Sequence, residues 1–469
     1  MSFLFRRLLG FIMTLLCVIL IAFTLFQHLT GDPVERLTNA NARFSNWSEK
    51  CAADRDYQNQ ANLIHSNLPV FYVGLQTSAY PDTLYNIVRK DERAMLQQLI
   101  ATYGNWPLIQ PYFHTLKRLQ YLSYQLPEDS LATAVNIFRS NISQLLIQQD
   151  ETAIRFTLSQ IKVQTDTTLV WKPILGATPQ NLANQLNEIT QKPTQNKHYW
   201  PQFTWYGTQN QFHTYISGLL KGNFGISYMT DHASVGDKIL KALPWTLTLS
   251  ILSLMFIFAI SIPLGVWAAR QKGSGWDRFI MTVTLGIGAV PLFWLGTMAI
   301  LLLSSSPYGL GIFAGTNISD TYGANDVWWQ KILQGAAHLI LPIICIVVHG
   351  LSMILRQVRS GTLTVLREDY IRTAQAKGLS SKIVLWRHAF RNSLLPIIST
   401  FASAFPGLFA GNLITEYVFN IPGMGRLLAE SVGNQDTPVV LGILIVGSCW
   451  ALLGTTLADF MYRWADPRV

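Results

Sequence analysis

The sequence predicts an all-α membrane protein with six transmembrane helices and a mainly helical domain inserted between the first two. Three observations lead to this prediction. The chain of 469 residues is 49% hydrophobic and only 13% charged, which is too apolar for an ordinary soluble protein. Six stretches lack Asp, Glu, Lys and Arg, and each has about the 20-residue length that crosses a bilayer core as helix. Between the first two lie roughly 210 residues, enough for a domain.

The six predicted spans are residues 8–26, 246–269, 279–303, 336–355, 392–415 and 437–458. The first follows Arg6 and Arg7 and resembles a secretory signal, but its apolar run is longer than usual. No small-x-small cleavage pattern follows it. We therefore expect residues 1–30 to form a retained anchor helix.

The distribution of Lys and Arg predicts the orientation. With the N-terminus inside, the inner segments hold 15 Lys and Arg, whereas the short outer loops hold only Lys331 and Arg426. Positive residues gather on the cytoplasmic side of membranes. Both termini, including the tail 461–469, are therefore expected in the cytoplasm, and the loop 31–242 on the outer side. The net charge of +9 follows from this topology and does not indicate a nucleic-acid partner.

Apolar residues recur at helical spacing in the large outer loop. The predicted helices are 91–100, 116–126, 131–147 and 150–163. Residues 164–206, rich in Gln, Asn, Thr and Pro, give no clear prediction. We expect a small helical domain over about 45–205. Cys51 is its only Cys, so no internal disulfide is possible, and its scattered His residues form no metal-ligand pattern. A packing or docking module without catalysis is the favoured interpretation.

The chain carries no sign of its own energy source. A P-loop needs Gly-Lys followed by Ser or Thr, and the dipeptide Gly-Lys does not occur. Spans two to six hold no acidic or basic residue of the kind that proton- or voltage-driven machines use. We expect energy to arrive from another polypeptide. The longest inner segment, 356–391, is where it could enter.

A short helix is predicted within this inner segment. Asp369 is a plausible N-cap, and Gly378 is a good C-terminal stop. The small side chains of Ala374 and Ala376, together with Tyr370, would let a partner groove approach closely. The alternative is a solvated basic loop that only obeys the positive-inside bias.

The segment 369–379, Asp-Tyr-Ile-Arg-Thr-Ala-Gln-Ala-Lys-Gly-Leu, resembles the "EAA" loop of membrane permease subunits of bacterial ABC importers, in the dipeptide, oligopeptide and nickel branch. Its continuation at 387–396 is equally similar to that branch. Further matches occur in order along the chain at 30–33, 222–227, 243–247, 416–427 and 466–468.

The resemblance implies a type I ABC importer permease fold with its core at 243–460. It implies a coupling helix that docks on a cytoplasmic ATPase. The residues of this coupling segment are Asp369, Tyr370, Arg372, Thr373, Ala374, Ala376, Lys377, Gly378 and Leu379. It also implies a sister permease as heterodimer partner, two ATPase subunits that bind ATP and Mg, and an extracytoplasmic substrate-binding protein, all at the bacterial inner membrane. The chain itself is then non-catalytic and holds no cofactor or metal.

Two departures from the family pattern stand out. The generic loop has Glu, Ala and Ala where this chain has Arg372, Thr373 and Ala374, a change typical of the peptide branch. Relatives usually have a short first outer loop, so residues 43–208 look like an insertion. The insertion could dock the binding protein, gate substrate release or pack against the sister subunit.

Residues after the fifth span are candidates for an outer gate or mouth: Glu416, Phe419, Pro422, Gly423 and Gly425. The acidic residues Glu416, Glu430 and Asp436 could attract cationic groups of a substrate. We favour the alternative that they form a solvated rim.

Two other classes of protein remain open at this stage. A membrane receptor or signalling subunit would use the outer domain for sensing, but it predicts a sizeable cytoplasmic output domain. A membrane-embedded enzyme would need convergent His, Asp or Glu at membrane depth, for which His349 is weak support. The substrate also stays open, because peptides, nickel complexes, sugars and antimicrobial peptides are carried by similar relatives.

Overall fold

The computed structural model describes residues 2–27, 32–38, 47–127, 132–194, 197, 199–229, 233–304, 309–314, 328–380, 383–389 and 412–465. The chain divides into two compact units. We call Met1–Gln27, Phe224–Ser227 and Ala233–Val469 the membrane unit. We call His28–Asn223 and Tyr228–His232 the helical unit. Each unit is described by itself.

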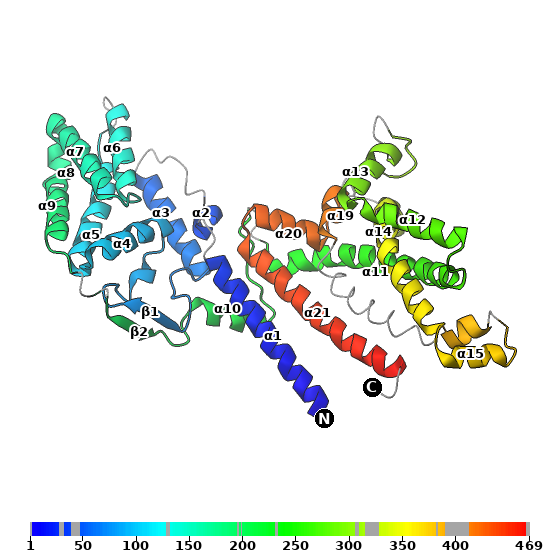
Figure 1. Cartoon of the computed structure of the whole chain (residues 1–469). Helices are drawn as coiled ribbons and strands as arrows, with labels where there is room; N and C mark the ends of the chain where they lie inside the picture. The colour runs from blue at the N-terminus through cyan, green and yellow to red at the C-terminus, as the bar shows by residue number, and fades with distance from the viewer. Residues whose placement is uncertain are drawn as a thin grey trace. The chain divides into compact units, whose positions relative to one another are not determined.

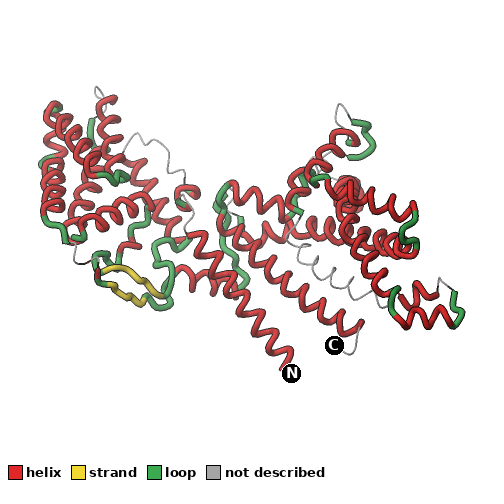
Figure 2. Tube along the Cα trace, viewed as in Figure 1, coloured by secondary structure: helices red, strands yellow, loops and turns green. Residues whose placement is uncertain are grey.

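The membrane unit is built from long apolar helices (Figures 1 and 2). Its described helices are α1 (Ser2–Gln27), α11 (Val235–Arg270), α12 (Gly275–Ala289), α13 (Leu292–Leu303), α14 (Trp328–Val365), α15 (Asp369–Ala376), α19 (Leu413–Val418), α20 (Met424–Gly433) and α21 (Thr437–Ala465), with a π-helical turn at Val384–Ala389. Among them, α1, α11, α14 and α21 are each long and apolar enough to cross a membrane. These four match the first, second, fourth and sixth predicted spans. Of the fifth predicted span, residues 392–411 lie outside the described residues. The motif residues 30–31, 390–396 and 466–468 also lie outside them.

The third predicted span, 279–303, was wrong as a continuous helix. The structure breaks it into α12 and α13, which are bent by 92° relative to each other. Val290 is extended and ends α12, and Pro291 precedes α13. Proline has no N–H to continue the helical ladder and pushes the residue before it out of the helical region. A hydropathy window detects the apolar run but not this break.

The most extensive packing in the membrane unit joins α11 to α14. Two glycines bring the helices together. A Cβ on Gly265 would lie 2.8 Å from Val358 Cγ1, and one on Gly350 would lie 2.5 Å from Ile257 Cδ1. Small residues at such crossings allow the close backbone approach that holds membrane helices together. The α11–α14 pair is therefore the frame on which the other helices of this unit are placed.

The helical unit consists mainly of short helices around one core. Its described helices are α2 (Pro33–Leu37), α3 (Trp47–Leu63), α4 (Lys90–Tyr103), α5 (Trp106–Ser123), α6 (Ala132–Leu145), α7 (Glu151–Thr167), α8 (Lys172–Leu175), α9 (Thr178–Gln191) and α10 (Gln211–Leu220), with 3₁₀ turns at Leu84–Asn86 and Leu169–Trp171. The four predicted helices correspond to α4, α5, α6 and α7. Helix α5 begins at Trp106, well before the predicted residue 116, because Pro107 is favourable in a first helical turn.

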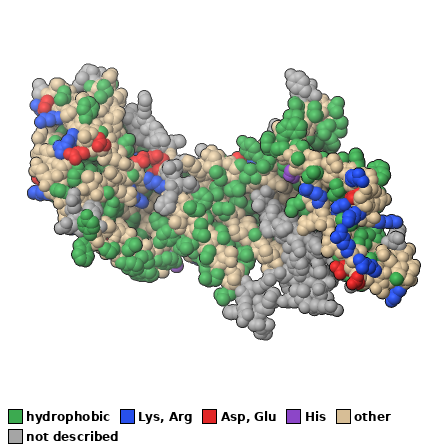
Figure 3. Space-filling view, in the orientation of Figure 1, with side chains coloured by type: hydrophobic (Ala, Val, Ile, Leu, Met, Phe, Trp, Pro, Cys, Tyr) green, Lys and Arg blue, Asp and Glu red, His purple; other side chains and the backbone are tan. Residues whose placement is uncertain are grey.

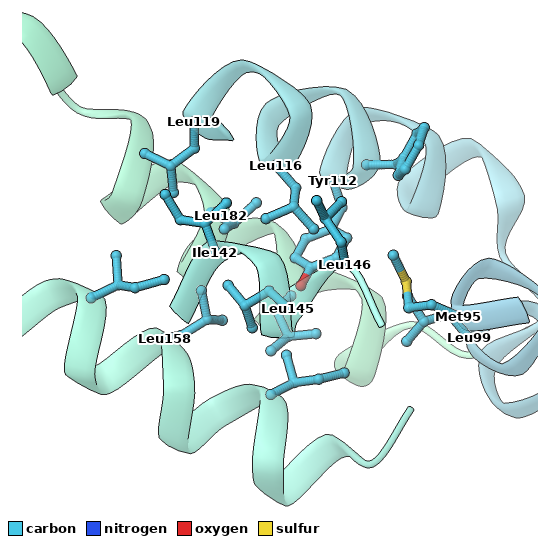
Figure 4. Packing of buried hydrophobic residues seen from close by; sticks show 14 of the residues in the cluster. Met95, Leu99, Tyr112, Leu116, Leu119, Ile142, Leu145, Leu146, Leu158 and Leu182 are labelled. Carbon is cyan, nitrogen blue, oxygen red and sulfur yellow. The ribbon is translucent and has the colours of Figure 1, made fainter. Parts of the chain in front are cut away.

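The core of this unit gathers side chains from α4, α5, α6, α7 and α9 (Figure 4). The labelled residues are Met95, Leu99, Tyr112, Leu116, Leu119, Ile142, Leu145, Leu146, Leu158 and Leu182. Most are fully buried, and Trp171 and Phe138 join them with ring centroids 5.1 Å apart. The unit thus has a hydrophobic core of its own, as expected of an independent domain.

The helical unit also contains a two-stranded antiparallel sheet that the sequence did not predict. Strand β1 (Val73–Thr77) pairs with β2 (Pro201–Trp205), with Val73 opposite Trp205 and Leu75 opposite Phe203. The strands are separated by the whole helical core in sequence. Local patterns cannot reveal a pairing over such a distance, and β2 falls in the range 164–206 that gave no prediction.

A buried polar cluster fixes α2, the first helix after the membrane anchor. Asp32 Oδ1 accepts a hydrogen bond of 2.9 Å from Val34 N, and Asp32 Oδ2 accepts one from the Tyr57 hydroxyl. The Arg89 guanidinium lies 4.5 Å from the Tyr57 ring centroid and 3.1 Å from Asp54 Oδ1. Burial, followed by the hydrogen bond to Asp32, raises the pKa of Tyr57 above its usual value. The hydroxyl therefore stays protonated and keeps donating at neutral pH.

We predict that Tyr57→Phe loosens α2 and α3. The substitution removes the hydroxyl that donates to Asp32 Oδ2 and leaves only the Val34 N bond to Oδ1, and a hydrogen bond to a charged group contributes about 1.5–3 kcal/mol. Hydrogen exchange of the α2 and α3 amides in the full-length protein should accelerate about tenfold or more. The matched control is Tyr199→Phe, because Tyr199 is 82% exposed. Equal exchange in the two variants would contradict the role given to Tyr57.

Candidate functional site

The first candidate site is the short helix α15, which follows α14 after one turn. Glu368 occupies the N-cap position and makes no side-chain capping bond, so the predicted cap, Asp369, is instead the first helical residue. Lys377 is the C-cap, and Gly378 follows it with φ of 77°. This left-handed conformation favours glycine, which confirms Gly378 as the residue that ends the helix.

One face of α15 is packed on the chain itself. Ile371 is fully buried and Ala374 is 7% exposed, and both pack against Val365, Leu366 and Val384. The prediction that Ala374 faces a partner was therefore wrong. Residues three apart share one side of a helix, and Ile371 turns that side inward.

The opposite side of α15 and the turn after it are open to solvent. The residues with substantial exposure are Tyr370, Arg372, Thr373, Ala376, Lys377, Gly378 and Leu379. Arg372 and Asp369 form a 3.4 Å ion pair on this surface, between side chains that are 73% and 95% exposed. Lys and Arg side chains gather around this end of the membrane unit (Figure 3). The helix thus presents an exposed side that carries both charge signs, while its inner face is fixed.

An ion pair connects the start of α12 with the part of α14 that leads to α15. Arg359 Nε and Nη2 donate to Asp277 Oδ1 and Oδ2, each at 2.7 Å. Asp277 Oδ2 also accepts a 2.8 Å hydrogen bond from Gly273 N, and Ser274 Oγ accepts one of 3.2 Å from Asp277 N. Asp277 is only 3% exposed. The α11–α12 turn and the end of α14 are thereby joined.

The sequence analysis missed this pair as a site. Ser274 followed three residues later by an acidic residue is a helix-start pattern, so the position of Asp277 could have been found locally. The partner Arg359 is 82 residues away and could not.

The second candidate site is organised by Glu416, which is fully buried in α19. Its Oε1 accepts a 2.8 Å hydrogen bond from Thr246 Oγ1 of α11. Its Oε2 accepts hydrogen bonds from Gly425 N at 2.6 Å and Arg426 N at 3.1 Å. Thr246 Oγ1 accepts a further one of 2.7 Å from Met424 N. A carboxylate at the N-terminus of α20 is stabilised by the free amides and the helix dipole there.

The two glycines of this motif make room for the carboxylate. A Cβ on Gly423 would lie 2.4 Å from Glu416 Oε2, and one on Gly425 would lie 2.6 Å from Leu413 Cα. Phe419 is 4% exposed and lies against Gly296 of α13, whereas Pro422 is exposed. Of the five gate candidates, four are therefore buried around one hydrogen-bonded centre.

The favoured interpretation of the acidic residues as a solvated rim was wrong for two of them. Asp436 is fully buried and accepts a hydrogen bond from Ser227 Oγ, which in turn accepts one of 2.8 Å from Lys238 Nζ. Glu416 is bonded as described above. Glu430 is part-exposed and pairs with Arg426 Nε at 2.7 Å. A buried carboxylate is stable only with such partners, and the partners come from distant parts of the chain.

Among the described residues, no three His, Cys, Asp or Glu side chains lie together in a way that could hold a metal ion. In the part of the chain that the structure describes, we identify two candidate sites. One is an exposed helix at the end of α14, and the other is a buried carboxylate centre at the start of the apolar part of α11.

Several long apolar helices in one unit are typical of a polytopic membrane protein. Residues 261–469 match the family described as binding-protein-dependent transport system inner membrane component. The chain is 36% identical over 272 residues to the di/tripeptide transport system permease protein DppB of Pseudomonas aeruginosa, covering 55% of this chain and 80% of the relative. The chain belongs to this family of inner membrane transport components, as its motifs predicted.

Other relatives give the same result. The oligopeptide transport system permease protein AppB of Bacillus subtilis is 34% identical over 261 residues, which cover 55% of this chain and 79% of the relative. The dipeptide transport system permease protein DppB of Escherichia coli K12 is 34% identical over 274 residues, with coverages of 55% and 80%.

We predict that Gly425→Ala destabilises the membrane unit. The added methyl group meets the Leu413 backbone, which cannot move aside as a flexible side chain would, and overpacking of this kind costs about 1–3 kcal/mol. Gly433→Ala is the matched control in the same helix, because a Cβ there meets nothing within 4 Å. The control should be neutral or stabilising by up to about 1 kcal/mol. Thermal unfolding of the two purified variants measures the difference, and equal midpoints would refute the steric argument.

We predict that the Asp277–Arg359 ion pair stabilises the membrane unit. In a double-mutant cycle with Asp277→Asn and Arg359→Gln, the loss of stability in the double variant should be smaller than the sum of the single losses by about 0.5–3 kcal/mol. The corresponding cycle on the exposed pair Asp369 and Arg372 should give a coupling close to zero. Additive effects in the first cycle would show that the buried pair does not hold α12 to α14.

Proposed function

We propose that this chain is the permease subunit of an ATP-driven importer of peptides and forms half of the translocation pathway. The observation that carries the proposal is α15, a helix packed on α14 by Ile371 and Ala374 with its other side exposed. A helix that must receive a push from a partner needs both features. It needs a free surface for the partner and a rigid connection to the membrane helices.

The packing contacts of the membrane unit supply a route from α15 to the Glu416 site. A displacement of α15 acts on the end of α14, and α14 is closely packed against α11 through Gly265 and Gly350. Thr246, which binds Glu416, lies about 36 Å along α11 from Arg270, by the rise of a helix. That distance is comparable with the thickness of a bilayer core. In our proposal α11 and α14 carry the motion from the ATPase side to the α19–α20 segment.

The partners follow from the family and the relatives. We propose two cytoplasmic ATPase subunits, which bind ATP and Mg, and a sister permease that completes the pathway as a heterodimer. We also propose a substrate-binding protein on the outer side. The names of the relatives specify dipeptides, tripeptides and oligopeptides, and we take peptides as the substrate class on that basis. Both termini would lie in the cytoplasm and the helical unit outside the bacterial inner membrane.

The exposed surface of α15 favours this proposal over a receptor or signalling subunit. In the receptor alternative the inner segment 356–391 would lead to an output domain. Such a receptor would not need α15 to be packed tightly on the end of α14. In the importer the connection is essential, because mechanical work has to pass through it.

Purification of the full-length protein from native membranes in mild detergent, with mass spectrometry of co-purifying proteins, tests the proposal. The expected result is recovery of a P-loop ATPase together with a second multi-span permease. Recovery of neither, from a preparation in which this chain stays folded, would overturn it.

We predict that Ala376→Trp on the exposed side of α15 abolishes ATPase recovery and transport. A bulky ring at a surface that has to fit a partner groove prevents close approach, whereas the packed face at Ile371 and Ala374 is untouched. The control is Lys272→Trp, which places the same bulk on the exposed α11–α12 turn. The control should retain the ATPase. Loss of the ATPase in both variants, or in neither, would contradict the assignment of α15 as the docking element.

A further inference from the structure

The sheet of the helical unit has one strongly apolar face. Alternate residues of a strand point to the same side, so Val73 and Leu75 of β1 share a face with their cross-strand partners Trp205 and Phe203. Their exposed fractions are 36%, 76%, 67% and 69% respectively. These are large values for side chains of this kind in a folded unit with a well-filled core.

The opposite face of the sheet is polar and folded onto the unit itself. Gln76 Nε2 donates a 3.0 Å hydrogen bond to the Tyr206 hydroxyl. Thr204 Oγ1 donates one of 3.0 Å to Asp82 Oδ1. Tyr206 also covers Gly74, where a Cβ would lie 2.8 Å from its ring. The sheet is therefore oriented by its polar side, and its apolar side is the one directed outward.

Two more exposed aromatic residues flank the apolar side. Tyr199 and Trp200 directly precede β2 and are 82% and 71% exposed. We define the aromatic face as these two residues together with Val73, Leu75, Phe203 and Trp205. It contains no charged side chain, and hydrophobic side chains gather at this end of the unit (Figure 3). An exposed apolar patch on a folded domain marks a contact surface.

We propose that the aromatic face binds the surface of the lipid bilayer. Its composition is the first argument. Tyr and Trp are enriched at the membrane–water interface, where their rings contact the acyl boundary and their O–H and N–H groups stay in the polar layer. Three of the six residues are Tyr or Trp, and the other three are purely hydrocarbon.

The second argument is the place of the sheet in the chain. β2 leads into α10, and the segment before β1 contacts both of them. Gln211 N donates to Pro69 O at 2.9 Å, Phe212 N donates to Val70 O at 3.1 Å, and the Tyr72 ring stacks on that of Trp205 with centroids 6.3 Å apart. After α10 only a few residues separate Leu220 from Phe224, which belongs to the membrane unit. The aromatic face thus lies on the part of the helical unit that leads directly to the membrane spans.

The third argument is the tether at the other end of the unit. Helix α1, an apolar candidate span, ends at Gln27, and α2 begins at Pro33. An extended link of this length reaches about 20 Å. With both ends held at the bilayer, the unit is kept within reach of the lipid surface, and its effective concentration there is high. A weak apolar contact is then enough to hold it.

Spin-label accessibility on the full-length protein in lipid nanodiscs tests this proposal. The native Cys17, Cys51, Cys345 and Cys449 are replaced by Ser, and a nitroxide is attached at Phe203→Cys or at Gln202→Cys. The two positions are adjacent in β2 and lie on opposite faces of the sheet. Oxygen, which concentrates in lipid, and a water-soluble nickel chelate are the collision probes. The ratio of oxygen collisions to nickel-chelate collisions should be severalfold higher for the label at 203 than for the label at 202.

Two results would overturn the proposal. Equal access of the nickel chelate to both labels would place the aromatic face in water. Protection of the label at 203 from both probes would mean that protein covers it, as a docked binding protein or the membrane unit would. The pair Leu75→Cys and Gln76→Cys on β1 repeats the comparison, so that a folding defect in one variant does not decide the outcome. The proposal is independent of what the protein transports.

Discussion

The close packing of α11 against α14 is the contact on which the rest of the membrane unit depends. Gly265 and Gly350 let the two backbones approach until Val358 and Ile257 fill the space a methyl group would need. Helix α11 contributes Thr246, which binds Glu416. Helix α14 contributes Arg359, which binds Asp277, and Val365, which packs against α15. Because packed helices do not deform continuously, our proposal has movement at one end of this pair passed to the other.

Two buried carboxylates hold the ends of this frame, and both are satisfied completely. Asp277 receives two hydrogen bonds from Arg359 and one from a backbone amide, and Glu416 receives its bonds from Thr246 and the start of α20. Leaving such a charge unpaired away from water would cost several kcal/mol. Each carboxylate therefore acts as a fixed joint between elements that local sequence does not connect. The Glu416 contacts require glycine at 423 and 425, because a Cβ at either position would meet Glu416 or Leu413.

The helical unit has a core of its own, and the chain joins it at both ends to the membrane unit. The Asp32–Tyr57 bond and Arg89 fix α2 a few residues after α1 ends, and α10 leads back into the membrane unit. The aromatic face, in our proposal, adds a lipid contact between these two tethers. A domain held in this way keeps a defined side toward the bilayer.

Much of the architecture was determined by the sequence alone. Uncharged runs of 20 residues identified most of the spans, helical periodicity identified α4 to α7, and glycine chemistry identified the end of α15 at Gly378. These features depend on the local backbone and on solvent, which a short window of sequence contains. The break at Pro291, the inward direction of Ala374 and the pairing of β1 with β2 required the tertiary structure. So did Arg359 as a partner of Asp277 and Thr246 as a partner of Glu416, which lie 82 and 170 residues away, because pairing of that kind is set by how distant segments pack.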